Sequence, residues 1–200
     1  MILFEHKCLF IHIPKTGGNS IQNILNTFSE DDIVTFEHHQ DGIERFEVRN
    51  KEYNITKHSA YTDYQQQLKL SDFSLLFKFA VIRNPWDRLI SYYFSPHRNV
   101  SIWSREEFIE LVHNVKPIRH YICPKNCKDK LDSHIDFLAR FEFLEDDLVN
   151  ISQIINIDFK NLPHRNKSIR RDYRSYYDDQ LRKLVFNKFK EEIEFGNYQF

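Results

Sequence analysis

Two short stretches of the chain carry residue types that suit the binding of anions. The first, "HIPKTGGNS" at 12–20, follows an apolar run and places Lys15 before Gly17 and Gly18. The chain has only four glycines, so an adjacent pair indicates a backbone that turns tightly or approaches a ligand closely. A glycine loop that opens a helix points its N–H groups and the positive end of the helix dipole at one place. We therefore predict a site for a phosphate-type anion, to which Lys15 adds a charge.

Side chains around the glycines add further donors, since Thr16, Asn19 and Ser20 carry hydroxyl or amide groups. The order differs from that of a nucleoside-triphosphate loop, in which G-x-x-x-x-G-K-[ST] places the lysine after the glycines. A Walker B strand ends in an Asp that helps to hold Mg²⁺, whereas the comparable apolar run here ends in Arg83. A plain tight turn before a helix is the alternative interpretation of this loop.

The second stretch, "RNPWDRLIS" at 83–91, places a guanidinium and a hydroxyl group on either side of a helix start. Arg83 and Ser91 together would clamp a second phosphate, because a planar guanidinium can bind two phosphate oxygens at once. Taken alone, they would more simply be a structural ion pair and a serine on a helix face. Two separate phosphate sites in one chain favour an adenosine that carries phosphates at both its 5′ and 3′ positions.

Apolar runs and helical spacing predict the elements that hold these stretches in place. Ser20 and Asn84 are the expected N-caps, and Gly196 is the expected helix stop. Strands are expected at 8–13, 74–82 and 135–142, and helices at 20–28, 83–94, 104–115, 145–157 and 178–195. Strands that alternate with helices indicate an α/β fold with a parallel sheet, and such sheets bind ligands at the carboxyl ends of their strands.

The composition narrows the classes of protein to which this chain can belong. A length of 200 residues, with 41% hydrophobic and 28% charged residues, predicts one folded domain over 1–200. The net charge of -1 disfavours a general nucleic-acid binder. The three cysteines do not suggest a disulfide framework, and no stretch approaches the roughly 20 apolar residues of a membrane span. The N-terminus lacks an export signal, so we expect a cytoplasmic protein without a transmembrane segment.

Both stretches resemble motifs of a known family. "FIHIPKTGGNSI" is similar to the 5′-phosphosulfate loop, and "FAVIRNPWDRLISYYF" to the 3′-phosphate motif, of the carbohydrate sulfotransferases that use 3′-phosphoadenosine-5′-phosphosulfate (PAPS). This branch includes heparan sulfate 2-O-, HNK-1 and chondroitin 4-O-sulfotransferases and many small bacterial homologues. "IDFLARFEFLEDDL", "LPHRNKS" at 162–168 and the closing helix extend the resemblance over residues 9–200. It implies a three-layer P-loop-like α/β fold, with a central parallel sheet flanked by helices.

The resemblance also implies roles for individual residues. The cradle of the 5′-phosphosulfate would consist of Lys15, Thr16, Gly17, Gly18, Asn19 and Ser20. Arg83 and Ser91 would hold the 3′-phosphate, and Ser168, with Lys167 beside it, would lie by the cofactor. Asn19 stands where the family more often has Thr, and it keeps a hydrogen-bond donor at that position.

The implied reaction is an in-line transfer of the sulfuryl group from PAPS to a hydroxyl of a carbohydrate or glycolipid, leaving adenosine 3′,5′-bisphosphate. Lys15 would stabilise the departing phosphate oxygen. His58, in "TKHSAYTDY", is the expected general base, with Glu37 and His39 as reserves. Lys57 is expected to be a solvated lysine, with help to the sulfuryl group as the alternative. The segments 30–70 and 95–134 are expected to set the choice of acceptor.

Other interpretations of the sequence stay open. A nucleotide kinase or NTPase on the same scaffold is one rival, and a PAPS-binding homologue without catalysis is another. Arg140 and Glu142, two apart on a predicted strand, are interpreted as a structural ion pair. A zinc site is a possible interpretation of His120, Cys123, Cys127 and His134. Because their spacing is not one of the usual structural-zinc patterns, no metal site is expected.

Overall fold

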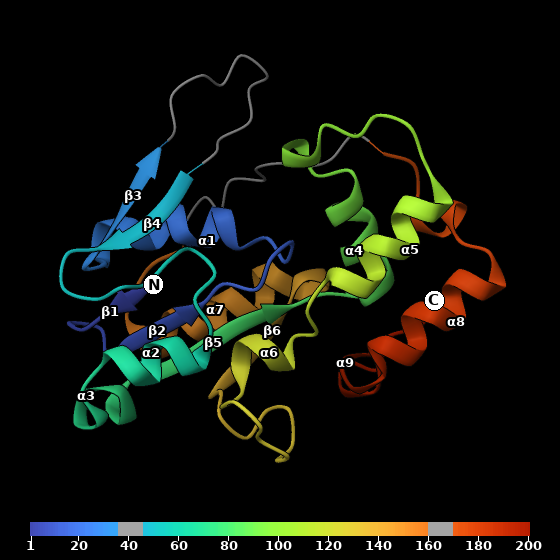
Figure 1. The fold of residues 1–200 in the computed structure, drawn as a ribbon. Helices are drawn as coiled ribbons and strands as arrows, with labels where there is room; N and C mark the ends of the chain where they lie inside the picture. Colours follow the sequence, from blue (N-terminus) through green and yellow to red (C-terminus); the bar gives the residue numbers. More distant parts are fainter. Residues whose placement is uncertain (36–45, 160–169) are drawn as a thin grey trace.

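A four-stranded sheet forms the centre of the computed structural model, which describes residues 1–35, 46–159 and 170–200 (Figure 1). β2 (Cys8–Ile11), β5 (Phe77–Ile82) and β6 (Phe137–Arg140) run parallel, and β1 (Ile2–Leu3) pairs antiparallel with β2. The strand order is β1-β2-β5-β6. The predicted α/β fold, with a mostly parallel sheet flanked by helices, is confirmed.

β2 and β5 are apolar along almost their whole length because both faces of the sheet are covered. Every residue of β2 is buried, and in β5 only Phe77 is partly exposed. Ile11 pairs with Ala80, so the two strands end at the same edge of the sheet. This register brings the two loops with candidate functional residues next to each other.

Successive side chains of these strands point alternately into two cores. Leu9 and Ile11 belong to one core, and Phe10 and Phe79 belong to the other. The first core is closed by α2 (Tyr61–Gln67), α3 (Leu70–Leu75) and α6 (Arg119–Ile122), and the second by α1 (Gly18–Leu25) and α7 (Leu144–Ile155). The helices that follow β2 and β5 therefore begin at one edge of a rigid, buried sheet.

A third core lies beside the sheet, where the C-terminal helices gather (Figure 1). It is built by α4 (Pro85–Tyr93), α5 (Arg105–Asn114), α8 (Asp179–Lys188) and α9 (Lys190–Phe195). Trp103 packs there against Tyr93 and Phe108, with ring centroids 4.9 Å apart in both pairs. These rings pack one side of α4 and so fix the helix that follows Arg83.

Several predicted boundaries are wrong, each for a local reason. The helix expected at 178–195 is two helices, because the chain leaves helical geometry at Phe189, with φ −112° and ψ 23°. Ser20 is not an N-cap: α1 starts earlier, and its cap is Gly17. Asn84 does cap α4, since its side chain accepts a hydrogen bond from the Trp86 N–H. Gly196 follows the last helix as predicted.

The strands predicted at 74–82 and 135–142 are shorter than expected. The first begins only at Phe77, because the residues before it belong to α3. The second ends at Arg140, where the 3₁₀ turn η3 (Phe141–Phe143) takes over. An antiparallel pair that the sequence did not predict, β3 (Asp31–Thr35) and β4 (Phe46–Asn50), forms a second, small sheet.

The remaining short turns connect these elements. They are the 3₁₀ turns η1 (Asn26–Phe28), η2 (Pro96–Arg98) and η4 (Tyr173–Tyr176). Within the described ranges, no helix is both long enough and apolar enough to cross a lipid bilayer.

Candidate functional site

The loop between β2 and α1 turns through two residues with left-handed backbone geometry. Lys15 has φ +69° and Gly17 has φ +86°. A lysine in this region is uncommon, and such strained residues concentrate at functional sites. The Thr16 hydroxyl is buried and donates to the Ile13 carbonyl at 2.8 Å, so it braces the loop. Any contact of Thr16 with an anion would therefore come from its backbone N–H.

Gly18 is required by a neighbouring side chain. A Cβ at this position would lie 2.1 Å from Cδ2 of His12, which is far inside van der Waals contact. The His12 ring is itself buried, and its Nδ1 is 2.9 Å from the Gln22 side-chain oxygen. The two glycines thus serve different purposes: Gly17 permits the turn, and Gly18 leaves room for a histidine.

Arg83 joins the two candidate loops directly. Its guanidinium donates to the Lys15 carbonyl at 3.0 Å and to Asp87 at 2.6 and 2.9 Å. It also lies over the Phe141 ring, 4.0 Å from the centroid. Asp87 pairs in addition with Arg170, so one carboxylate serves two guanidinium groups. The anion clamp and the structural ion pair expected for Arg83 are therefore compatible, because the pair holds the guanidinium at the strand end.

Helix α4 presents one face to this loop. Asp87, Ser91 and Ser95 recur every four residues, which places them on one side of the helix and its extension. The first binds Arg83, and the Ser95 hydroxyl is 3.5 Å from the Lys15 ammonium. Ser91 is buried between these two contacts, and no hydrogen bond joins it to Arg83 among the described residues. The structure thus brings Ser91 to the predicted face without closing the predicted clamp.

Positive charge accumulates around Lys15. Burial, followed by the nearby charges of Arg83, Arg170 and Lys57, lowers the pKa of Lys15 to about 8. Burial also lowers the pKa of Arg83, although Asp87 opposes that effect. A lysine loses basicity when neighbouring cations repel its charge, and it regains basicity when an anion binds. This part of the site is therefore electrostatically suited to a ligand with more than one negative charge.

His58 lies next to the loop with one ring nitrogen fixed. Its Nδ1 is 3.1 Å from the His12 carbonyl oxygen, and the two imidazole rings are 4.5 Å apart. A carbonyl only accepts hydrogen bonds, so Nδ1 carries the proton and Nε2 is left as the basic nitrogen. Part of His58 is exposed to solvent, while the surrounding protein atoms lower its pKa to about 4. The ring is neutral at physiological pH and can accept a proton.

Two smaller sequence interpretations are wrong. Lys57 is not a solvated lysine: it is buried, with its ammonium 3.5 Å from the centroid of the Phe46 ring. Arg140 and Glu142 do not pair with each other. Glu142 instead accepts the Asn84 backbone N–H at 2.7 Å, because the chain turns at η3 and carries Glu142 toward the start of α4.

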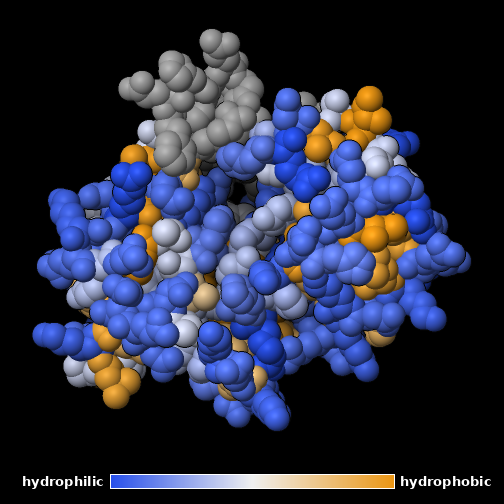
Figure 2. Space-filling view, in the orientation of Figure 1, coloured by the Kyte–Doolittle hydropathy of each residue, from blue (hydrophilic) through white to orange (hydrophobic). Residues whose placement is uncertain are grey.

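The other predicted residues divide between the loop and segments outside the described residues. Asn19 is half-buried and Ser20 is buried, both in the first turn of α1. Glu37, His39, Lys167 and Ser168 lie outside the described ranges. A hollow opens near the centre of the face in Figure 2, at the place where Figure 1 shows α1 facing α4. The hollow therefore lies between the two helices that follow β2 and β5.

Sequence reasoning missed three residues of this site. His12 was hidden because it stands inside an apolar strand run, and Ser95 lies one turn beyond the predicted phosphate motif. Arg170 follows the predicted "LPHRNKS" stretch by two positions, and only the folded chain brings it to Asp87. Asp87 and Ser91 are four residues apart, and a further step of four residues leads to Ser95. This spacing was the signal in the sequence that could have identified Ser95.

The fold and this site define an α/β protein with cationic side chains gathered at the carboxyl ends of its parallel strands. The chain matches a family model described as "Sulfotransferase family" over residues 1–199, and it therefore belongs to the sulfotransferase family. No curated protein and no solved structure matches the chain.

Proposed function

We propose that this protein transfers the sulfuryl group of PAPS to a hydroxyl of a carbohydrate or glycolipid acceptor. Family membership supports sulfuryl transfer in general. The choice of PAPS is supported by the surroundings of Lys15, where burial and then neighbouring cations lower its pKa to about 8, since the clustered cations would favour a multiply charged donor. The acceptor class, and the three-layer P-loop-like fold type, rest on the resemblance of the two motifs to the carbohydrate sulfotransferases.

The residues present fit such a donor. The helix dipole of α1 favours negative charge at the end of the helix where Gly18 and Asn19 stand. Lys15, Thr16, Gly17, Gly18, Asn19 and Ser20 would hold the 5′-phosphosulfate. Arg83, with Ser91 on the neighbouring helix face, would bind the 3′-phosphate, and Ser168 remains a proposed contact. When bound, PAPS supplies the sulfuryl group that is transferred.

The side chains of the protein would then act on charge and on a proton. The Lys15 ammonium would balance the negative charge that grows on the departing phosphate oxygen. Nε2 of His58 would accept the proton of the acceptor hydroxyl, since Nδ1 is committed to the His12 carbonyl. Glu37 and His39 stay as alternatives for this base. The contact of Arg83 with the Lys15 carbonyl would keep the two phosphate-binding loops at a fixed separation.

Thermal denaturation with adenosine 3′,5′-bisphosphate, with ADP and with ATP plus Mg²⁺ tests the donor. A ligand at 100 times its Kd adds about 2.7 kcal/mol to stability, so the bisphosphate should raise Tm measurably. Lys15→Met and Arg83→Met should abolish this rise, whereas Lys51→Met, which changes an exposed lysine paired with Asp32, should not. A rise with ATP plus Mg²⁺ alone would favour a kinase or NTPase instead.

Labelled PAPS offered with a panel of glycans and glycolipids tests catalysis. Transfer to any hydroxyl acceptor, together with bisphosphate binding, supports the proposal. The inactive PAPS-binding homologue would be favoured if the protein binds the bisphosphate but transfers to no acceptor. In that case His58→Ala should also cause no loss of function.

A further inference from the structure

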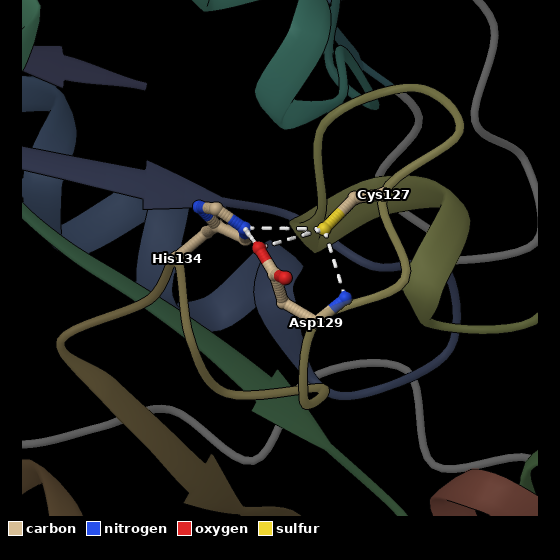
Figure 3. A group of neighbouring side chains, drawn as sticks. All are labelled: Cys127, Asp129 and His134. Carbon is tan, nitrogen blue, oxygen red and sulfur yellow. Dashed lines mark hydrogen bonds and ion pairs between the residues drawn. The ribbon is translucent and has the colours of Figure 1, made fainter.

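A second cluster of chemically capable side chains lies in the segment between α6 and β6. The Cys127 sulfur is 3.2 Å from Oδ2 of Asp129 and 3.3 Å from Nε2 of His134, and that nitrogen is 3.0 Å from the same Oδ2 (Figure 3). This cluster differs from the set of His120, Cys123, Cys127 and His134 that the sequence offers for zinc. The structure retains Cys127 and His134 from that set and adds Asp129.

The two other residues of the earlier set point elsewhere. The Cys123 thiol faces the Leu131 carbonyl at 3.6 Å, and the His120 ring packs edge-on against Tyr121. His120 and Cys123 therefore do not join this cluster, and the spacing of the sequence offered no reason to include Asp129.

The triangle of ligand atoms has the size that a tetrahedral zinc ion requires. Bond lengths of about 2.3 Å to sulfur and about 2.0–2.2 Å to nitrogen and oxygen place such ligand atoms about 3.3–3.6 Å apart. The observed edges of 3.0, 3.2 and 3.3 Å are within a few tenths of an ångström of these values. A small outward movement of each side chain would admit the ion.

The arrangement does not match a nucleophilic triad. In such a triad the histidine uses one nitrogen for the nucleophile and the other for the carboxylate. Here a single nitrogen, Nε2 of His134, faces both the sulfur and the carboxylate oxygen. One imidazole nitrogen holds either one proton or one lone pair, so it cannot serve two partners as well as it can serve a metal ion between them.

The surrounding contacts hold the ligands in place before any ion binds. The Arg119 guanidinium donates to the Cys127 carbonyl at 3.3 Å and to the Asp129 carbonyl at 2.7 Å. The Asp129 N–H points at the Cys127 sulfur at 3.3 Å, a contact that stabilises a thiolate. The His134 ring rests edge-on against Tyr61, with ring centroids 5.6 Å apart.

The charges of the three side chains also match that of a divalent ion. A Cys127 thiolate and an Asp129 carboxylate together offer two negative charges, and a neutral His134 adds none, so a divalent ion is balanced. Arg119 does not oppose the ion with its full charge, because it pairs with Glu191.

We propose that Cys127, Asp129 and His134 bind a zinc-class divalent cation, with a water molecule as the fourth ligand. Asp129 is exposed and the other two ligands are half-buried, so the fourth position faces solvent. The segment leads into the amino end of β6, whereas the candidate sulfotransferase site lies at the carboxyl ends of β2 and β5. The ion would therefore fasten the segment from Cys127 to His134 and take no part in sulfuryl transfer.

The test uses the full chain, stripped with a chelator and kept reduced. Zinc titrated in competition with a chromophoric chelator should bind at one equivalent per chain, and Co²⁺ should give thiolate-to-cobalt charge-transfer absorption with tetrahedral visible bands. Cys127→Ser, Asp129→Asn and His134→Gln should each weaken zinc binding at least tenfold. His120→Ala and Asp132→Asn, two exposed neighbours, serve as matched controls and should bind zinc like the wild type.

The cobalt spectrum of the wild-type chain decides the question even if a variant fails to fold. A spectrum without thiolate-to-cobalt absorption, or less than a tenth of an equivalent of zinc bound at micromolar free metal, would overturn the proposal. Equal zinc affinity in the wild type and in folded Cys127→Ser would overturn it as well.

Discussion

The Gly18 backbone lies directly against the His12 ring, so closely that a Cβ on Gly18 would be 2.1 Å from Cδ2 of that ring. The start of α1 therefore packs directly against the residue that follows β2. His12 cannot easily retreat, because Gln22 holds its Nδ1 and the ring stacks on Phe10.

Gly18→Ala should lower the free energy of unfolding by about 1–3 kcal/mol, the usual cost of forcing an extra group into a packed interior. Urea denaturation measures this change. In the His12→Ala background the same substitution should cost much less, because the clashing ring is gone, and the double-mutant cycle should show the coupling. Equal losses in the two backgrounds would mean that the ring does not limit this position.

Gly17→Ala should also destabilise the protein, through backbone strain at φ +86° and through a Cβ that would lie 3.0 Å from the Phe141 ring, neither of which involves His12. A residue with a Cβ in the left-handed region costs about 1–2 kcal/mol. Because this strain is independent of His12, the cost should be the same with and without the His12→Ala change. Urea denaturation of the wild type, Gly17→Ala, His12→Ala and the double variant measures the cost of Gly17→Ala with and without His12. A cost that disappears in the His12→Ala background would contradict this explanation.

Binding of adenosine 3′,5′-bisphosphate near pH 8 should take up protons. Burial and neighbouring cations lower the pKa of Lys15 to about 8, so near that pH about half of the ammonium groups have lost a proton. A bound anion raises the pKa again, and Lys15 then recovers its proton. Calorimetry in buffers of different ionisation enthalpy should find this uptake at pH 8 and less at pH 6.

Lys15→Met should remove the proton uptake at pH 8, while Lys51→Met, a change at an exposed lysine, should retain it. Bisphosphate binding without any uptake in the wild type would show that Lys15 does not sense the ligand.

The acid limb of kcat/KM should fall below the usual histidine range. Enclosure lowers the pKa of His58 from 6.5 to about 4, and a base works only in its unprotonated form. Because kcat/KM reports the free enzyme, activity should persist at pH 6 and be lost as the pH falls toward 4. His58→Ala should lower kcat by about 10²–10⁴-fold, with bisphosphate binding retained. Unchanged kcat in that variant would assign the base to another residue, such as His39 or Glu37.

A buried ion pair should make stability depend on pH. Arg88 and Glu192 meet at 3.1 Å and are almost fully buried, and Oε1 of Glu192 has no partner among the described residues. Burial raises the pKa of Glu192 from 4.5 to about 7. An acid whose pKa is higher in the folded state loses stabilisation as the pH rises from 4.5 to 7. The loss should be about 3 kcal/mol, from roughly 1.4 kcal/mol per pKa unit.

Urea denaturation across this pH range should show that slope in the wild type and a flatter one in Glu192→Gln. Arg88→Ala should be much more harmful, by about 3–5 kcal/mol at pH 7, because it leaves a buried carboxyl group without its partner. A slope unaffected by Glu192→Gln would place the titrating group elsewhere.

The sequence predicted the central architecture because its signals are local. Buried strand runs, a glycine pair and the Asn84 cap are each recognisable within a few residues, and they place Lys15 and Arg83 at neighbouring strand ends. The contact between Arg83 and the Lys15 carbonyl is the physical result of that placement. The antiparallel pair of β3 and β4 was missed because its residues mix polar and apolar types.

Other features depend on tertiary contacts that no spacing encodes. His12 looked like one more residue of a buried strand, and its closeness to Gly18 and His58 follows only from the path of the loop. Arg170 reaches Asp87 across 83 positions of the chain. The break at Phe189 lies within a regular helical pattern, and the backbone departs from it there without any proline or glycine.

The pairing of Ile11 with Ala80 has a consequence for anyone who wishes to move this site into another scaffold. Each residue of a strand advances the chain by about 3.3 Å, so a slip of two residues would separate the two loops by about 7 Å along the sheet. A slip of one residue would turn every side chain to the opposite face. The two loops therefore cannot be transferred alone: a transplant must also carry the alignment of the buried strands β2 and β5.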